Sequence, residues 1–163
     1  VDRRDYGILL DDMRPYERLN QSGLIAGVML AHIVYREVDE LPAGFSSQWI
    51  ERELRGRVGF GGAIFCDDLS MRATAAYGDM PGRALRALRA GCDMILVCND
   101  RAAAQETVAA LNSYSNPLSL VRLARLHATG RMSRETLLAS DEWQQASADV
   151  TRWSQRPPLE LNA

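Results

Sequence analysis

The sequence predicts an α/β fold in which parallel strands alternate with helices. Three apolar runs stand out along it: Leu24–Ala31, Phe60–Cys66 and Asp93–Cys98. None of them alternates polar with apolar residues, which is typical of strands covered on both faces, as in a parallel sheet. The runs follow one another at about thirty to thirty-five residues, the length of a βα unit with its return crossover. We expect three parallel strands side by side in chain order, at Ile25–Ala31, Ala63–Cys66 and Met94–Val97.

Helical patterns fill the segments between these runs. Ser46 and Ser47 can cap a helix after the first strand, and Gly56 lies near its predicted end. The helix after the second strand begins with Pro81 in its first turn and ends at Gly91. One further helix is expected before the first strand, and the others lie after the third, at 102–112, 118–128, 133–139 and 141–153.

Polar residues follow each apolar run, which bears on the kind of sheet. His32 follows the first run, Asp67-Asp68 the second and Asn99-Asp100 the third. Three parallel strands could form a small open sheet or part of a (β/α)₈ barrel, known as a TIM barrel. The glycine-rich fingerprint of dinucleotide-binding sheets is absent after the strands. Because TIM barrels carry their active sites at the carboxyl ends of the strands, these polar residues favour the barrel.

The length limits how much of such a barrel the chain can form. At 163 residues it suits one domain with a real core and is too short for two. Three strands cannot close a barrel that needs eight. We therefore expect a single incomplete domain, with the last βα units of a TIM barrel in residues 1–112 and a C-terminal helical extension in residues 113–163. A tail containing Pro157-Pro158 should be frayed.

The composition excludes several classes of partner. A formal net charge of −2 argues against nucleic acid, since phosphate binding requires a clearly basic face. No stretch approaches the roughly 20 apolar residues that cross a bilayer, and the first residues do not resemble a signal peptide, so no membrane partner is expected. Cys66, Cys92 and Cys98 are interpreted as small buried thiols in a reducing cytosol, with a disulfide or metal site as the alternative.

The adjacent carboxylates Asp67 and Asp68 are the sharpest chemical feature. Neighbouring side chains on a strand point in roughly opposite directions, so one can face a barrel mouth while the other caps the next segment. On the residues alone, such a pair serves loop capping or solvated charge more often than catalysis. His32 could likewise be a packing residue or a functional one, and Met71 could line a pocket or pack in the core.

Three segments carry a resemblance to a known family: Val28–Tyr35, Gly62–Met71 and Ala90–Asn99. They resemble the bacterial β-N-acetylhexosaminidases of glycoside hydrolase family three, of the peptidoglycan-recycling type, and the similarity extends from about Asp11 to Trp153. The resemblance implies that the first carboxylate of the pair, Asp67, is the catalytic nucleophile. That family usually has Ser or Thr before the nucleophile, where this chain has Cys66. A thiol is a weaker hydrogen-bond donor, so we expect tuning and not loss of function.

The resemblance also implies a substrate and a mechanism. It implies a retaining exo-β-N-acetylglucosaminidase that releases N-acetylglucosamine from muropeptides in the cytoplasm through a glycosyl-Asp intermediate, with no metal or organic cofactor. In that family the acid is a His, assisted by an Asp, on a mobile loop upstream of the region that this chain covers. The expected partner is therefore the missing N-terminal part of the same enzyme, and the isolated chain should be inactive or nearly so. Within the chain we expect His32 and Met71 to bind substrate.

Two alternatives remain at this point. One is another TIM-barrel enzyme of the lyase or aldolase kind, using the strand-end Asp and His. A Schiff-base mechanism is disfavoured because all 19 basic residues are Arg. The other alternative is a non-catalytic interaction domain. Its sign would be an activity that neither needs Asp67 nor returns when the missing half is supplied.

Overall fold

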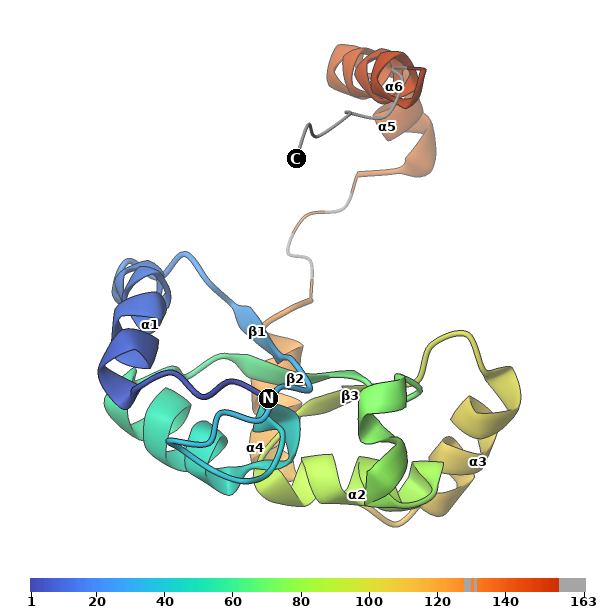
Figure 1. Cartoon of the computed structure of the whole chain (residues 1–163). Helices are drawn as coiled ribbons and strands as arrows, with labels where there is room; N and C mark the ends of the chain where they lie inside the picture. The colour runs from blue at the N-terminus through green and yellow to red at the C-terminus, as the bar shows by residue number, and fades with distance from the viewer. Residues whose placement is uncertain (128–129, 131, 156–163) are drawn as a thin grey trace. The chain divides into compact units, whose positions relative to one another are not determined.

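The computed structural model describes residues 1–127, 130 and 132–155 (Figure 1). The chain forms two compact units, Val1–His127 and Ala128–Ala163, which are described separately. The elements of the first unit are α1 (Tyr6–Gln21), β1 (Gly27–Leu30), η1 (Ala43–Phe45), η2 (Gln48–Arg57), β2 (Ala63–Asp68), η3 (Arg72–Tyr77), α2 (Met80–Ala90), β3 (Met94–Leu96), α3 (Arg101–Ala110) and α4 (Pro117–Ala124). The second unit contains α5 (Arg134–Ala139) and α6 (Asp141–Ser154).

The sheet has the predicted topology. Its order is β1-β2-β3, and both neighbouring pairs are parallel. Each predicted strand is found, although β1 begins two residues later than expected and β2 continues two residues further, through Asp67 and Asp68. The prediction of an α/β fold with three adjacent parallel strands is therefore confirmed.

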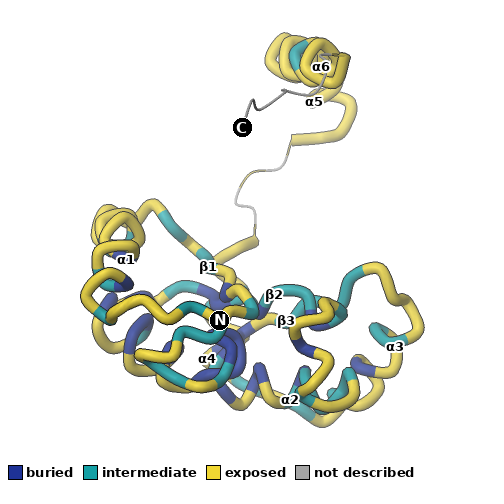
Figure 2. Tube along the Cα trace, in the orientation of Figure 1, coloured by how far each residue is buried: buried dark blue, intermediate teal, exposed yellow. Residues whose placement is uncertain are grey.

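The core of the first unit lies where the sheet meets η1, η2 and α2. Ile64 and Cys66 of β2 are fully buried, as are Ile50 of η2 and Ala84 and Ala87 of α2. Figure 2 shows buried residues gathered in these elements, with α2 running below the sheet. Full burial of an Ile or Leu side chain stabilises a fold by about 1.5–3 kcal/mol, so this layer fixes the position of β2 and of the residues at its end.

Helix α2 follows the predicted boundaries closely. The Asp79 side chain caps it by accepting a 2.9 Å hydrogen bond from the backbone N–H of Gly82, and Pro81 lies in the first turn. Gly91 ends the helix with φ 114°, a value that favours glycine. A Cβ at Gly91 would also lie 2.6 Å from Ile50 Cγ2. Only glycine fits this turn, which leads directly into β3.

The other helices agree with the sequence pattern in position and differ in detail. Ser46 Oγ accepts a 3.1 Å hydrogen bond from the Trp49 N–H, as a capping residue should, but η2 is a π-helix and continues past Gly56. The short 3₁₀ helices η1 and η3 were not predicted. Helix α4 ends at Ala124, and the last residue of the predicted helix 118–128 lies outside the described residues, as does the predicted frayed tail from 156 onward.

A buried carboxylate at the amino ends of the strands joins four elements. The Asp93 side chain has no exposed surface. Its oxygens accept hydrogen bonds from Arg55 Nη2 (2.8 Å), the Ile64 N–H (2.9 Å), Ser119 Oγ (2.6 Å) and Arg122 Nη1 (2.9 Å). Burial alone would raise the pKa of Asp93, but these donors outweigh it and hold that pKa below its ordinary value. Asp93 therefore ties η2, β2 and α4 to the start of β3.

The second unit is a pair of short helices. Neither α5 nor α6 has a fully buried residue, and α6 is exposed along nearly its whole length in Figure 2. The first compact unit includes α4 and reaches His127, and the proposed division into residues 1–112 and 113–163 stays a prediction. Among the helices of the described residues, none is both long enough and apolar enough to span a membrane.

Candidate active site

The carboxyl ends of the strands bring three of the predicted polar residues together: His32, Asp67 and Asp68. Asp67 and Asp68 are the last two residues of β2. His32 lies two residues beyond the end of β1, and its Nε2 is 3.0 Å from the Asp68 carbonyl oxygen. From β3, the Cys98 N–H donates a 2.9 Å hydrogen bond to Asp68 Oδ1. Asp68 thus connects all three strand ends, with Asp67 next to it in the chain.

An irregularity in the sheet coincides with the carboxylate pair. Phe65 pairs with Met94, and Asp68 pairs with Leu96, so β2 spans three steps where β3 spans two. The extra residue of β2 falls between Phe65 and Asp68. Bulges of this kind occur next to active sites, where they change the direction of a side chain. Asp67 lies within this irregular stretch, where β2 does not pair regularly with β3.

Both oxygens of the Asp68 carboxylate accept hydrogen bonds, two of them from backbone N–H groups. Oδ1 accepts from the Ser70 N–H at 2.9 Å as well as from Cys98, and Oδ2 accepts from Ser70 Oγ at 2.6 Å. Burial by itself raises the pKa of Asp68, but the hydrogen bonds from Ser70 and Cys98 more than offset it, so this pKa is lowered. The predicted capping role of Asp68 is confirmed, and its charge is paired with backbone donors.

The Asp67 carboxylate has much more freedom. Its Oδ1 accepts a 2.8 Å hydrogen bond from the Asp68 N–H, and its other oxygen accepts none from the described residues. The residue is partly exposed. A carboxylate held by one oxygen, with the other oxygen unoccupied, can attack an electrophilic carbon. Asp67 therefore has the geometry of a nucleophile, although its catalytic role stays a prediction.

The segment that follows the carboxylate pair is fixed by residues that sequence reasoning missed. Buried Thr74 donates from Oγ1 toward the carbonyls of Leu69 (2.7 Å) and Met71 (2.8 Å). Arg83 of α2 adds a 3.1 Å hydrogen bond to the Leu69 carbonyl. The Met71 side chain, 44% exposed, is presented on this braced segment. Its predicted contact with substrate stays a prediction.

Cys66 faces the core and not the open end of the sheet. It is fully buried, and a Cβ built on Gly44 would lie 2.8 Å from its Sγ. Cys92 is also fully buried, and its Sγ is 3.5 Å from the Gly44 carbonyl oxygen. The neighbouring Cys66 thiol and burial raise the pKa of Cys92. The prediction of small buried thiols is confirmed for these two residues, while Cys98 is only partly buried.

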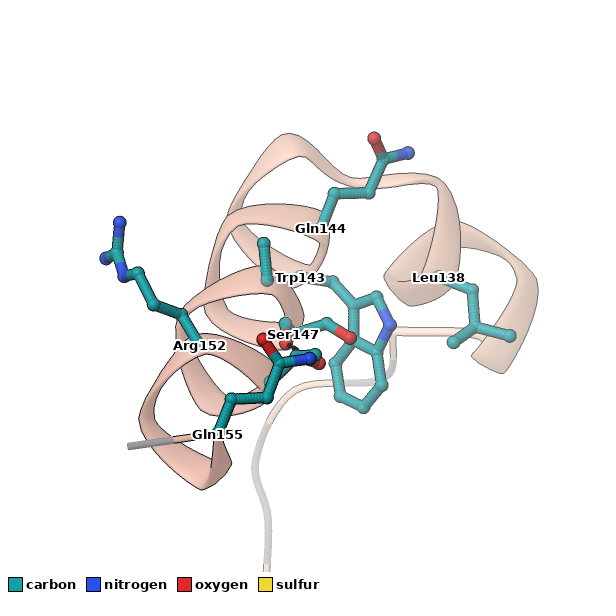
Figure 3. A pocket seen from close by; sticks show the side chains of 8 residues that line it. Leu138, Trp143, Gln144, Ser147, Arg152 and Gln155 are labelled. Atoms are coloured by element: carbon teal, nitrogen blue, oxygen red, sulfur yellow. Dashed lines mark hydrogen bonds between the residues drawn. The ribbon is translucent and has the colours of Figure 1, made fainter. Parts of the chain in front are cut away.

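Hollows also lie away from the carboxylate pair. One, on the second unit, has a volume of about 590 Å³ (Figure 3) and is lined by Leu138, Trp143, Gln144, Ser147, Ala148, Thr151, Arg152 and Gln155. None of these side chains is a carboxylate, a His or a Cys, so no general base stands in this lining to activate the hydroxyls of Ser147 and Thr151. Another is an apolar groove of about 610 Å³ along α1, β1 and η2. In the described part of the chain, no three His, Cys, Asp or Glu residues gather as a metal site.

Comparison with known proteins agrees with this arrangement. Residues 1–127 match the family model described as the glycosyl hydrolase family 3 N-terminal domain. The β-hexosaminidase of Thioalkalivibrio sulfidiphilus is 49% identical over 162 residues, which are 99% of this chain and 46% of that protein. The chain thus spans less than half the length of this relative.

Solved structures give the same result. NagZ from Neisseria gonorrhoeae, in complex with N-trifluoroacetyl-D-glucosamine, is 32% identical with a TM-score of 0.73 and covers 95% of this chain and 45% of its own. A family 3 β-N-acetylglucosaminidase from a Paenibacillus species has 25% identity and a TM-score of 0.70, over 99% of this chain and 35% of its own. With its parallel sheet, its strand-end carboxylates and the family match over residues 1–127, the chain belongs to glycoside hydrolase family 3.

Proposed function

We propose that this chain supplies the nucleophile, Asp67, of a retaining β-N-acetylglucosaminidase. The single observation that carries the proposal is the contrast between the two neighbouring carboxylates. Both oxygens of Asp68 accept hydrogen bonds, three in all, whereas Asp67, at the end of β2, accepts one at Oδ1 and none at its other oxygen from the described residues. In a family 3 enzyme, a free strand-end carboxylate is suited to attack on a sugar.

The chemistry that follows takes two steps. An oxygen of Asp67 attacks the anomeric carbon of the sugar and forms an ester, while the bond to the leaving oxygen breaks and an acid protonates that oxygen. Water then attacks the same carbon, and the ester is hydrolysed with release of the sugar and regeneration of the carboxylate. The two displacements together retain the configuration at the anomeric carbon.

The acid for the first step has no clear source among the described residues near Asp67. His32, the histidine at this end of the sheet, is bonded through Nε2 to the Asp68 carbonyl. The other histidine of the chain, His127, lies beyond α4. We therefore propose that the acid comes from the rest of the enzyme, as the family resemblance implies. The isolated chain should then be inactive or nearly so, since acid assistance alone contributes about 10²–10⁴-fold.

The apolar groove gives the rest of the enzyme a place to pack. It is lined by residues of α1, β1 and η2, including Leu9, Val28 and Trp49. Met29 of β1 is 54% exposed and Met94 of β3 is 38% exposed, so both outer strands present apolar side chains to solvent. A parallel sheet with open edges is a template for further strands. We propose that the remaining strands of a TIM barrel continue the sheet at the open edges of β1 and β3.

The substrate proposal draws on the relatives. The structure of the Neisseria gonorrhoeae relative holds N-trifluoroacetyl-D-glucosamine, an N-acetylglucosamine analogue, and the curated relatives carry the name β-hexosaminidase. We propose an N-acetyl-β-glucosaminide as substrate, released from muropeptide fragments in the cytoplasm. The muropeptide and the compartment rest on the sequence resemblance alone.

The test joins this chain to the part of the Thioalkalivibrio sulfidiphilus β-hexosaminidase that it does not match, here called the joined enzyme. The joined enzyme should hydrolyse a chromogenic N-acetyl-β-glucosaminide, with or without chelator, whereas the chain alone should not. Asp67→Asn should remove the activity. Asp79→Asn is the matched control, because Asn also caps helices and activity should be kept. A joined enzyme that folds and retains turnover with Asp67→Asn would refute the proposal.

A further inference from the structure

The His32 ring packs against neighbouring aromatic side chains. Its centroid lies 5.7 Å from that of Phe45, which is buried, and Phe45 in turn packs edge-on against Tyr77 at 5.1 Å. Phe45 belongs to η1 and Tyr77 to η3. The ring is therefore packed against an aromatic cluster that joins two elements around the strand ends.

Both ring nitrogens of His32 are unavailable to a sugar in this arrangement. Nε2 lies 3.0 Å from the Asp68 carbonyl oxygen. A carbonyl oxygen can only accept, so Nε2 carries the proton and donates. Nδ1 is buried and has no hydrogen-bond partner among the described residues. Neither nitrogen is thus presented to a hydroxyl of a bound sugar.

The hydrogen bond from His32 reaches the nucleophile through one residue. It fixes the carbonyl end of Asp68, while Cys98 and Ser70 fix the Asp68 carboxylate. With Asp68 held at both points, its N–H is directed at Asp67 Oδ1, at 2.8 Å. The pairing of β2 with β3 is irregular between Phe65 and Asp68 and resumes at Asp68, which pairs with Leu96. The hydrogen bond from His32 thus adds a contact from the β1 side to the point where regular pairing resumes.

We propose that His32 is a positioning residue for Asp67: it holds Asp68 so that the Asp68 N–H orients the Asp67 carboxylate for attack. This inference rests on the proposed function, since it assumes that Asp67 is the nucleophile. In this proposal His32 acts on Asp67 through the backbone of β2 and not by contact with the sugar. Misplacement of a reacting group by about 1 Å costs on the order of 10²-fold in rate.

The first test is kinetic and uses the joined enzyme. His32→Leu removes the donor, and kcat should fall by about 10²-fold while KM stays within about twofold. His32→Gln keeps a side-chain N–H near the position of Nε2 and should restore most of kcat. His127→Leu, at the other histidine, should change neither constant. A rise in KM with kcat unchanged, or no rescue by His32→Gln, would overturn the inference.

The second test needs no activity and uses the chain as it stands. The sequence has only two histidines, so long-range ¹H–¹⁵N spectra of the imidazoles are simple to assign. His32 should show the tautomer protonated at Nε2, and a proton on Nδ1 would contradict the geometry. If His32→Leu fails to fold, this spectrum still shows whether Nε2 donates the hydrogen bond. The kinetics of His32→Gln then still show whether kcat or KM changes.

The two proposals can fail separately. If Asp67→Asn retains turnover in the joined enzyme, the proposed function fails, whatever the tautomer of His32. If Asp67→Asn is inactive while His32→Leu leaves kcat unchanged, the nucleophile stands and the positioning role of His32 falls.

Discussion

The two ends of the small sheet use the same side chain in opposite ways. At the amino ends, Asp93 is fully buried and accepts hydrogen bonds from four residues of η2, β2 and α4. At the carboxyl ends, Asp67 is partly exposed and accepts one, from the residue next to it. A carboxylate with all its acceptor capacity used contributes to folding, and one with capacity left can react. The same division between a stabilising and a catalytic end is typical of TIM barrels.

The largest expected effect concerns the reactive end. In the joined enzyme, Asp67→Asn should reduce kcat by on the order of 10⁴–10⁶-fold, as removal of a nucleophile that forms a covalent intermediate does in other enzymes. The free energy of unfolding should change by less than about 0.5 kcal/mol, because the side chain is partly exposed and little bonded. Kinetics and urea unfolding measured on one preparation check both statements. A strongly destabilised Asp67→Asn variant would mean that Asp67, like Asp93, stabilises the fold, which would contradict the contrast between them.

The next effect concerns the stabilising end. Asp93→Ala should lower the free energy of unfolding by about 3–5 kcal/mol, since it leaves Arg55 and Arg122 without their buried partner. Urea-induced unfolding followed by circular dichroism measures the loss. Arg14→Ala is a suitable control, because its ion pair with Asp11 is exposed and contributes little. A loss for Asp93→Ala no larger than that of the control would contradict the role assigned to the cluster.

Asp68 lies between these extremes and should show a mixed effect. Asp68→Ala should destabilise the fold by about 1–3 kcal/mol, because the Cys98 and Ser70 N–H groups lose their acceptor. Turnover should fall but stay measurable, in contrast to Asp67→Asn. If the two variants exchanged roles, with Asp68→Ala inactive and Asp67→Asn active, the assignment of the nucleophile within the pair would be reversed.

The smallest expected effect is the pH dependence of stability. Glu53, Asp68 and Asp93 have pKa values held below their ordinary values of 4.5, 3.8 and 3.8. A lowered pKa in the folded state gives stability that is fully present above the ordinary value and lost as the pH falls through the folded one. The free energy of unfolding should therefore be steady near pH 6 and decline below about pH 4.

A variant separates the contribution of Asp93 from the rest. Urea unfolding of Asp93→Asn across the same pH range should show a weaker decline, because one of the three carboxylates no longer titrates. An equal slope in Asp93→Asn and in the unaltered chain would mean that the cluster does not hold the pKa of Asp93 down.

How much of this could be predicted from the sequence depends on the range of the interaction. The strands follow from local apolar runs, and the ends of α2 follow from Asp79, Pro81 and Gly91, whose effects are local. The capping of Ser70 by Asp68 spans two residues and was within reach for the same reason. The sequence also placed His32 at the right strand end, next to the carboxylate pair.

The rest depends on contacts between residues far apart in the chain. Asp93 was assigned to an apolar run, and its buried cluster was not predicted, because its donors lie far away in the sequence. Among them, Arg55 is 38 residues away and Ser119 is 26 residues away. The irregular pairing of β2 with β3 has no signature in the sequence of either strand. The brace formed by Thr74 and Arg83 was missed because a Thr and an Arg between two strands fit many roles.

Covalent trapping determines directly whether Asp67 is the nucleophile. The joined enzyme would be incubated with a slow 5-fluoro N-acetylglucosaminyl substrate, digested, and mapped by mass spectrometry. We expect an ester on the peptide that contains both carboxylates, with fragmentation placing it on Asp67, and no adduct in the Asp67→Asn variant. An ester on Asp68, or none at all in a joined enzyme that turns over normally, would contradict this assignment.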